Sequence, residues 1–149
     1  MPFKTEVYGE CLLFISRKIE ALKKQLSDLV EDAKNDSKST AGDKHETARA
    51  MMQIEQEKLG RQLRQLEEQK AILEKTGETK PAEKIIPGSL VKTNKGWIYL
   101  LTALGEIKVN GTPVFIISMQ SPLAIKLAGL VKGEAAEING TQYIVEGIS

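Results

Sequence analysis

The stretch YGECLLFISRKIEALKKQLSDLVEDA, residues 8–33, carries the pattern on which the fold prediction rests. Its apolar or bulky side chains recur at steps that alternate between four and three residues, at Tyr8, Leu12, Ile15, Ile19, Leu22, Leu26, Leu29 and Ala33. This spacing is the seam of a coiled coil, because two helical turns bring each position back to the same side of an α-helix. The stretch predicts one long helix that packs against a second helix.

A weaker run of the same kind supplies the second helix, with Met52, Leu59, Leu66 and Leu73 seven residues apart. If the chain reverses between Thr40 and Ala41, these residues face Leu29, Leu22, Ile15 and Tyr8, and each pair of residue numbers adds up to 81. The constant value favours an antiparallel hairpin within one chain over a dimer formed through the seam. We predict a monomer with a coiled-coil hairpin over residues 1–77 and its tip near residues 36–47.

Two features of this hairpin leave alternatives open. Gly60 lies inside the second helix, where glycine is about 1 kcal/mol less favourable than alanine. It either allows a close backbone approach opposite Ala21 or is a tolerated exposed glycine. Basic residues, among them Lys58 and Arg61, form either a basic flank or an ordinary solvated face, since acids are interleaved with them.

The tip contains GDKHE, residues 42–46. Asp43 and Glu46 have the spacing of acids at a helix N-terminus, where one side chain caps free N–H groups and both complement the helix dipole. His45, the only histidine in the chain, is interpreted as an exposed turn residue, because one histidine with two carboxylates is an unspecific metal signal. No pairing of a nucleophile with a base stands out, so the chain does not resemble an enzyme by itself.

The chain changes character after a linker at residues 78–86, since four of the five prolines and eight of the twelve glycines follow Lys80. Short β-rich runs alternate with turn signals, and Asn110-Gly111 and Asn139-Gly140 predict two-residue hairpins. SPLAIKLAGL, residues 121–130, has Ser121 as helix cap, Pro122 in the first turn and Gly129 as stop. We predict an α+β protein whose residues 87–149 form a small antiparallel sheet with one short helix. The predicted core of this sheet consists of Trp97, Tyr99, Phe115, Ile117, Leu123, Leu127, Ile138 and Tyr143.

The composition limits the possible partners and compartments. Twenty-one basic side chains balance twenty acidic ones, which argues against a general polyanion binder. A single cysteine, Cys11, suits a reducing compartment. With no signal-peptide pattern and no apolar run of membrane-spanning length, we expect a cytoplasmic protein that binds no membrane.

The C-terminal run ISMQSPLAIKLAGLVKGEAAEINGTQYIVEGI, residues 117–148, resembles the C-terminal domain of the Gre transcript-cleavage factors of bacterial RNA polymerase. The resemblance includes the Ser-Pro-x-Ala helix start, the Leu-x-Gly helix end and the closing hairpin. It implies an FKBP-like fold for this domain and a preceding antiparallel coiled coil. It further implies that Ser121, Pro122 and Gly129 belong to a surface that binds the polymerase.

The same resemblance gives Asp43 and Glu46 a role beyond capping, because family members that promote cleavage carry a Gly-Asp-x-x-Glu element at the tip. It implies that the hairpin enters the secondary channel of the polymerase. There the two acids help to hold the second catalytic Mg²⁺ and position the water that attacks the nascent RNA near its 3′ end. The chain alone is then expected to bind no cofactor.

Departures from the family keep other functions open. After Glu46 the family usually continues with Asn-Ala-Glu-Tyr, whereas this chain has Thr47, Ala48, Arg49 and Ala50. A channel-binding regulator that does not stimulate cleavage is therefore the main alternative. An FKBP-like peptidyl-prolyl isomerase or chaperone is a further one, although the aromatic residues form no recognisable isomerase pocket.

Overall fold

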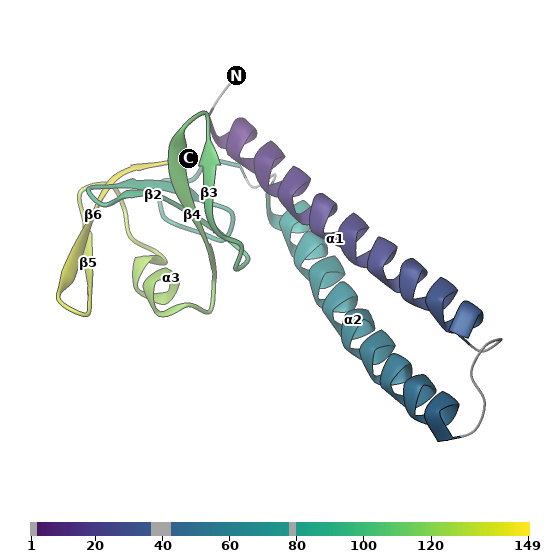
Figure 1. Cartoon of the computed structure of the whole chain (residues 1–149). Coiled ribbons are helices and arrows are strands. Elements are labelled where there is room, and N and C mark those ends of the chain that lie inside the picture. Colours follow the sequence, from purple (N-terminus) through teal and green to yellow (C-terminus); the bar gives the residue numbers. More distant parts are fainter. Residues whose placement is uncertain (1–2, 37–42, 78–79) are drawn as a thin grey trace. The chain divides into compact units, whose positions relative to one another are not determined.

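The computed structural model describes residues 3–36, 43–77 and 80–149, and only the backbone of residues 33, 35, 36 and 43–45. Two long helices are followed by six strands, with one short helix between the fourth and fifth strands (Figure 1). The chain divides into two compact units, one of Phe14–Glu68 and one of Met1–Leu13 together with Gln69–Ser149. The second unit, called the sheet unit below, thus contains the sheet and both ends of the helical region.

The two long helices are α1, Phe3–Asp36, and α2, Asp43–Thr76. In the unit Phe14–Glu68, the predicted seam residues are buried or half-buried, while most residues between them are exposed. They are Ile15, Ile19, Leu22, Leu26 and Leu29 on α1, and Met52, Gln56, Leu59, Leu63 and Leu66 on α2. The predicted helices and their apolar stripes are confirmed, whereas the predicted reversal at Thr40 and Ala41 lies outside the described residues.

In the described residues, the β-rich runs form six strands. They are β1 Leu90–Thr93, β2 Gly96–Leu101, β3 Gly105–Val109, β4 Thr112–Ser118, β5 Ala135–Ile138 and β6 Thr141–Ile148, in the sheet order β3-β4-β2-β1-β6-β5. Both Asn-Gly hairpins are confirmed, since β3 pairs with β4 and β5 with β6 in antiparallel register. Asn110 and Asn139 have φ angles of 52° and 51°, and the glycines that follow them have 80°. Such positive values are those of a type I′ turn, which Asn-Gly favours.

The prediction of a purely antiparallel sheet is wrong at one pair, because β2 and β4 run parallel, with Trp97 opposite Val114 and Leu101 opposite Ser118. Turn signals fix only hairpins between strands that follow each other in the chain. β3 pairs with the outer side of β4, so β4 lies beside β2 and runs in its direction. The four consecutive buried residues Ile98–Leu101 fit this central position, since such a strand is covered on both faces.

One face of the sheet packs against α3, Pro122–Leu127. Ala124 and Leu127 of α3 belong to a buried cluster with Val91, Ile98, Leu100, Ala136 and Val145. Ile85 belongs to the same cluster, and its N–H donates to Leu130 O at 2.9 Å. Thus the last part of the predicted linker contributes to the core of the sheet unit.

The opposite face carries Leu90, Tyr99, Leu101, Val114 and Ile116, all buried. The two ends of the helical region in the sheet unit contact residues of this face. The ring centroids of Phe3 and Trp97 lie 4.8 Å apart, and Tyr99 OH donates to Gly77 O at 3.5 Å. Alternating side chains of the central strands therefore fill two separate layers.

The predicted core is wrong at Phe115, because the side chain of this residue is 43% exposed. Its neighbours Val114 and Ile116 are buried on the face that also carries Tyr99. Side chains alternate along β4, so Phe115 points to the other face, where the cluster around α3 does not cover it. Tyr99 and Leu127 of the predicted core are fully buried, and the other five residues are half-buried.

Within the described residues, no helix is long and apolar enough to cross a membrane.

Candidate functional site

The acidic tip residues lie in the first turn of α2. Asp43 is the first residue of this helix, and Glu46 follows one turn later with an exposed side chain. The side chains of Asp43 and His45 lie outside the described residues, as do the predicted capping contacts. The described part of the tip thus presents one solvent-accessible carboxylate near the positive end of a 34-residue helix.

The helix surface after Glu46 contains a cleft of about 320 Å³, lined by Arg49, Met52, Gln53 and Gln56. Met52 and Gln56 are both positions of the seam. The polar Gln56 replaces an apolar residue of the heptad pattern, and this stretch of the seam carries a polar hollow.

Ser121, Pro122 and Gly129 first have a structural role, which is to define α3. The Ser121 hydroxyl accepts a hydrogen bond from Ala124 N at 3.2 Å, and Pro122 is the first residue of the helix. Gly129 has a φ of 82°, and its N–H donates to Ile85 O at 2.8 Å. The predicted helix start and stop are confirmed. Ser121 satisfies an N–H group that the helix start leaves open, and Leu130 N, just past Gly129, donates to Leu127 O of the last turn at 3.1 Å.

The solvent side of α3 carries a residue that the sequence reasoning did not single out. Ile125 is 62% exposed, and the neighbouring Pro122 and Lys126 are exposed as well. The helical spacing contains this signal, since Ala124 and Leu127 are buried three residues apart and Ile125 falls outside their stripe. Ser121 and Gly129 therefore position a short surface of Pro122 and Ile125.

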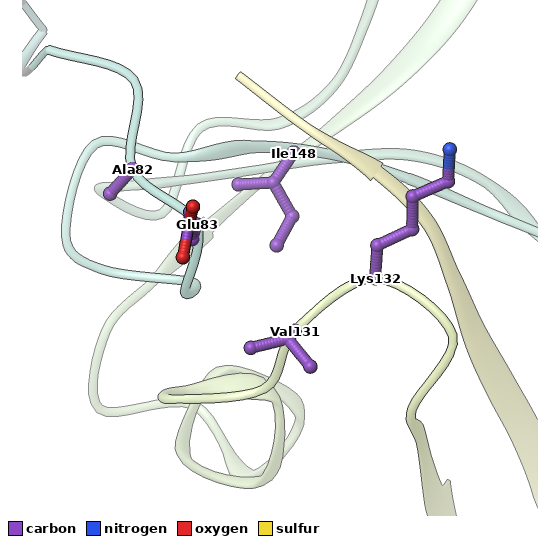
Figure 2. A pocket seen from close by; sticks show the side chains of 5 residues that line it. All are labelled: Ala82, Glu83, Val131, Lys132 and Ile148. Carbon is purple, nitrogen blue, oxygen red and sulfur yellow. The ribbon is translucent and has the colours of Figure 1, made fainter.

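Another cleft, of about 520 Å³, lies in the sheet unit and is lined by Ala82, Glu83, Val131, Lys132 and Ile148. Figure 2 shows Glu83 and Lys132 on opposite sides of Ile148. None of the five lining residues is aromatic. The cleft thus lacks the aromatic wall expected of a prolyl isomerase pocket, and the aromatic residues Trp97, Tyr99, Phe115 and Tyr143 do not line it.

Cys11 and Tyr99 are titratable groups buried in the sheet unit. Burial, with a smaller effect of Glu10, raises the pKa of the Cys11 thiol from 9.0 to about 12. Burial, with smaller effects of Cys11 and Tyr8, raises the pKa of Tyr99. Both groups are protonated at neutral pH, and a protonated thiol is a poor nucleophile and metal ligand. We therefore infer that Cys11 and Tyr99 contribute to the packing of the sheet unit and not to a reactive or metal-binding site.

Among the residues whose side chains are described, no three His, Cys, Asp or Glu side chains gather where they could hold a metal ion. Mg²⁺ is usually held by one or two carboxylates that share it with water and phosphate oxygens. The exposed Glu46 is a single carboxylate ligand. The remaining ligands of a Mg²⁺ site that includes it would have to come from another molecule.

Comparisons of the chain with models of known protein families, with curated proteins and with solved structures give no match.

Proposed function

We propose that this chain regulates bacterial RNA polymerase by placing the start of α2 in the secondary channel and stimulating the polymerase's own cleavage of backtracked nascent RNA. The observation that carries the proposal is Glu46, an exposed carboxylate in the first turn of a 34-residue helix that follows another of equal length. Helices of this length, at about 1.5 Å per residue, extend roughly 50 Å. This length suits a probe that reaches a buried active site.

The proposal includes two structural statements. The first is that α1 and α2 pack as an antiparallel hairpin, which the matching stripes around Ile15, Ile19 and Leu59 support. The second is that the sheet unit has an FKBP-like fold, which its mixed sheet and single helix α3 support. Such a hairpin would have Asp43 and Glu46 beside its turn, at the start of α2.

In the proposed mechanism, hydrolysis of the RNA phosphodiester is the polymerase's reaction, and this chain is an accessory factor. Asp43 and Glu46 would help to hold the second Mg²⁺ and orient the attacking water. In such a two-metal site, one metal would activate the nucleophile and the other would stabilise the leaving oxygen. Pro122 and Ile125, positioned by Ser121 and Gly129, would bind the polymerase outside the channel. The chain would act as a cytoplasmic monomer.

A second candidate is a regulator that occupies the same channel without stimulating cleavage. The residues after Glu46 favour it, because Thr47, Ala48, Arg49 and Ala50 supply neither the further acid nor the aromatic side chain of the family pattern. Both candidates require binding to the polymerase, and they differ in whether the tip acids change the rate of RNA hydrolysis.

Cleavage of nascent RNA in stalled, backtracked complexes tests the proposal. Wild-type protein should accelerate cleavage, and Asp43→Ala and Glu46→Ala should each abolish most of the acceleration. Glu57→Ala is the matched control, since Glu57 is an exposed glutamate of the same helix three turns later. Binding to the polymerase without any effect on cleavage would replace the favoured function with the second candidate. Failure to bind would remove both.

A further inference from the structure

The strand β3 lies at one edge of the sheet and has a neighbouring strand on one side only. The sheet order is β3-β4-β2-β1-β6-β5, so β3 pairs with β4 and its other side is open. Within the described part of the chain, no backbone group outside this ladder is hydrogen-bonded to β3. Such an edge can take up a further strand, because its outer N–H and C=O groups have no partner in the sheet.

The pairing with β4 indicates which residues of β3 direct their backbone groups to the open side. In an antiparallel pair, alternate residues exchange hydrogen bonds with the partner strand, and the residues between them direct their N–H and C=O groups away from it. Lys108 lies opposite Pro113, which has no N–H group, so these two residues cannot exchange hydrogen bonds. Lys108, and Glu106 two residues earlier, therefore direct their backbone groups outward.

These two outward residues are also the charged residues of the strand. Glu106 and Lys108 have exposed side chains, and no other residue between positions 96 and 125 is charged. The charge of Glu6, on α1, lies at the turn after β3, where it accepts from Asn110 Nδ2 at 2.8 Å. A lysine on an edge strand usually hinders pairing, but here a glutamate two residues away carries the opposite charge.

This order of charges is complementary to itself. When two copies of β3 pair antiparallel with Ile107 opposite Ile107, each Glu106 lies opposite a Lys108. The two residues of each pair then exchange backbone hydrogen bonds and form an ion pair. A shift to the next register that keeps the outward groups paired places Glu106 opposite Glu106 or Lys108 opposite Lys108, and like charges directly opposite are destabilising. The charges therefore select one register.

We infer that β3 is a dimerisation edge, through which two copies of this chain pair over Gly105–Val109 and join their sheets. The order of charges assigns the edge to a second copy, because a two-fold axis through Ile107 brings each charge opposite its complement. The exposed Phe115 fits this assignment. It lies opposite Glu106 on the same face, and the added strand would place the aliphatic stem of the partner's Lys108 on that face.

The inference goes beyond the proposed function and does not rest on it. An edge strand of five residues buries little surface, so the dimer should be weak. The monomer that we propose to act on the polymerase then predominates at low protein concentration.

Sedimentation equilibrium of the full chain at low salt, up to about 1 mM protein, tests the pairing, because small interfaces are weak and exposed ion pairs are screened by salt. Wild-type protein should show a monomer–dimer equilibrium. Glu106→Lys and Lys108→Glu should each weaken dimerisation by about 10-fold, because each places like charges opposite each other at both ends of the paired strands. An equimolar mixture of the two variants should dimerise again, since the charges of one strand are then opposite to those of the other.

Glu137→Lys is the matched control. Glu137 is an exposed glutamate of β5, the strand at the other edge of the sheet, so the substitution changes the net charge equally. It should leave dimerisation unchanged. Hydrogen exchange gives a second measurement, because the N–H groups of Glu106 and Lys108 should exchange more slowly as protein concentration rises, whereas that of Ile107, which faces β4, should not change.

The outcomes separate this inference from the proposed function. A wild-type chain that stays monomeric over this range of concentration overturns the inference and leaves the proposed function standing. Dimerisation that Glu106→Lys and Lys108→Glu do not weaken, or that their mixture does not restore, also overturns it. An equal effect of Glu137→Lys would assign the change to net charge and overturn the role of β3. A dimer that forms as expected in a chain that does not bind RNA polymerase removes the proposed function alone.

Discussion

Gly77, directly after α2, is a position where one added methyl group should destabilise the sheet unit. A Cβ atom built there would overlap the Tyr8 ring and lie 2.8 Å from Leu73 O. Gly77 N donates to that same Leu73 O at 2.8 Å, and Gly77 O accepts from the buried Tyr99 hydroxyl at 3.5 Å. Both backbone polar groups of Gly77 are therefore hydrogen-bonded. Gly77→Ala forces the Tyr8 ring or the backbone to move.

Overpacking of this kind typically destabilises a protein by 1–3 kcal/mol, and we expect about 2 kcal/mol here. For a domain of roughly 100 residues, 1 kcal/mol lowers Tm by about 4–8 °C, so Gly77→Ala should lower the Tm of the sheet unit by ~8–16 °C. Trp97, the only tryptophan, lies in this unit and beside Phe3, so its fluorescence reports the unfolding.

Gly60→Ala is the control with the opposite expected sign. Among the described residues, a Cβ at Gly60 would meet only the Arg64 guanidinium, at an ordinary 3.6 Å. This resolves the alternatives for Gly60 in favour of a tolerated glycine. Alanine there should stabilise α2 by about 1 kcal/mol through helix propensity, measured by circular dichroism.

The double variant Tyr8→Ala/Gly77→Ala tests the cause. Removing the ring should make Gly77→Ala much less destabilising than it is in the wild-type background, as a coupling between touching residues requires. A Tm of Gly77→Ala equal to or above that of wild type would refute the packing argument.

Two further predictions concern the sheet unit. Because the pKa of the buried Cys11 is raised to about 12, the folded state holds a proton that the unfolded state releases above pH 9, so stability should fall as pH rises from about 9 to 12. Denaturant unfolding of wild type and Cys11→Val across this range checks it, and an equally steep decline in Cys11→Val would assign the effect to other groups such as Tyr99. Asn139→Ala should destabilise the β5–β6 hairpin by about 1 kcal/mol, because alanine is strained at a φ of 51°, whereas Asn139→Gly should be tolerated. Thermal unfolding followed by Trp97 fluorescence compares them, and equal stabilities of the two variants would contradict the backbone explanation.

Local patterns in the sequence predict the elements of this fold well. Seam spacing locates both long helices, Asn-Gly pairs locate two hairpins, and Ser121, Pro122 and Gly129 delimit α3. Each of these signals acts within a few residues. The parallel pairing of β2 with β4 and the outward orientation of Phe115 depend on where strands lie in the sheet, and no local signal encodes that placement.

In the candidate site, too, local patterns predict some residues, whereas the exposure of others depends on the three-dimensional arrangement. Spacing predicts Asp43 and Glu46 as acids at a helix start, and the structure has both in the first turn of α2. Their proposed role in cleavage comes from the family resemblance. The exposed side chains of Met51 and Ile54 were not anticipated, because an apolar residue near a heptad seam is by default assigned to packing. Their exposure can be deduced only when it is known which side of α2 faces the other helix.

The division of the sheet unit into two distant pieces of sequence has a consequence for how the protein is made. Val7 and Cys11 are fully buried in a unit whose remaining residues begin at Gln69, and Glu6 accepts a hydrogen bond from Asn110 Nδ2 at 2.8 Å across 104 positions. Contacts of such sequence separation form late, because a long loop must close before they contribute. During synthesis, we expect the first turns of α1 to leave the ribosome early and to keep Val7 and Cys11 accessible until β2 and β4 have emerged. The Cys11 thiol, inert in the finished fold, is then a natural reporter of nascent chains that have not yet completed the sheet.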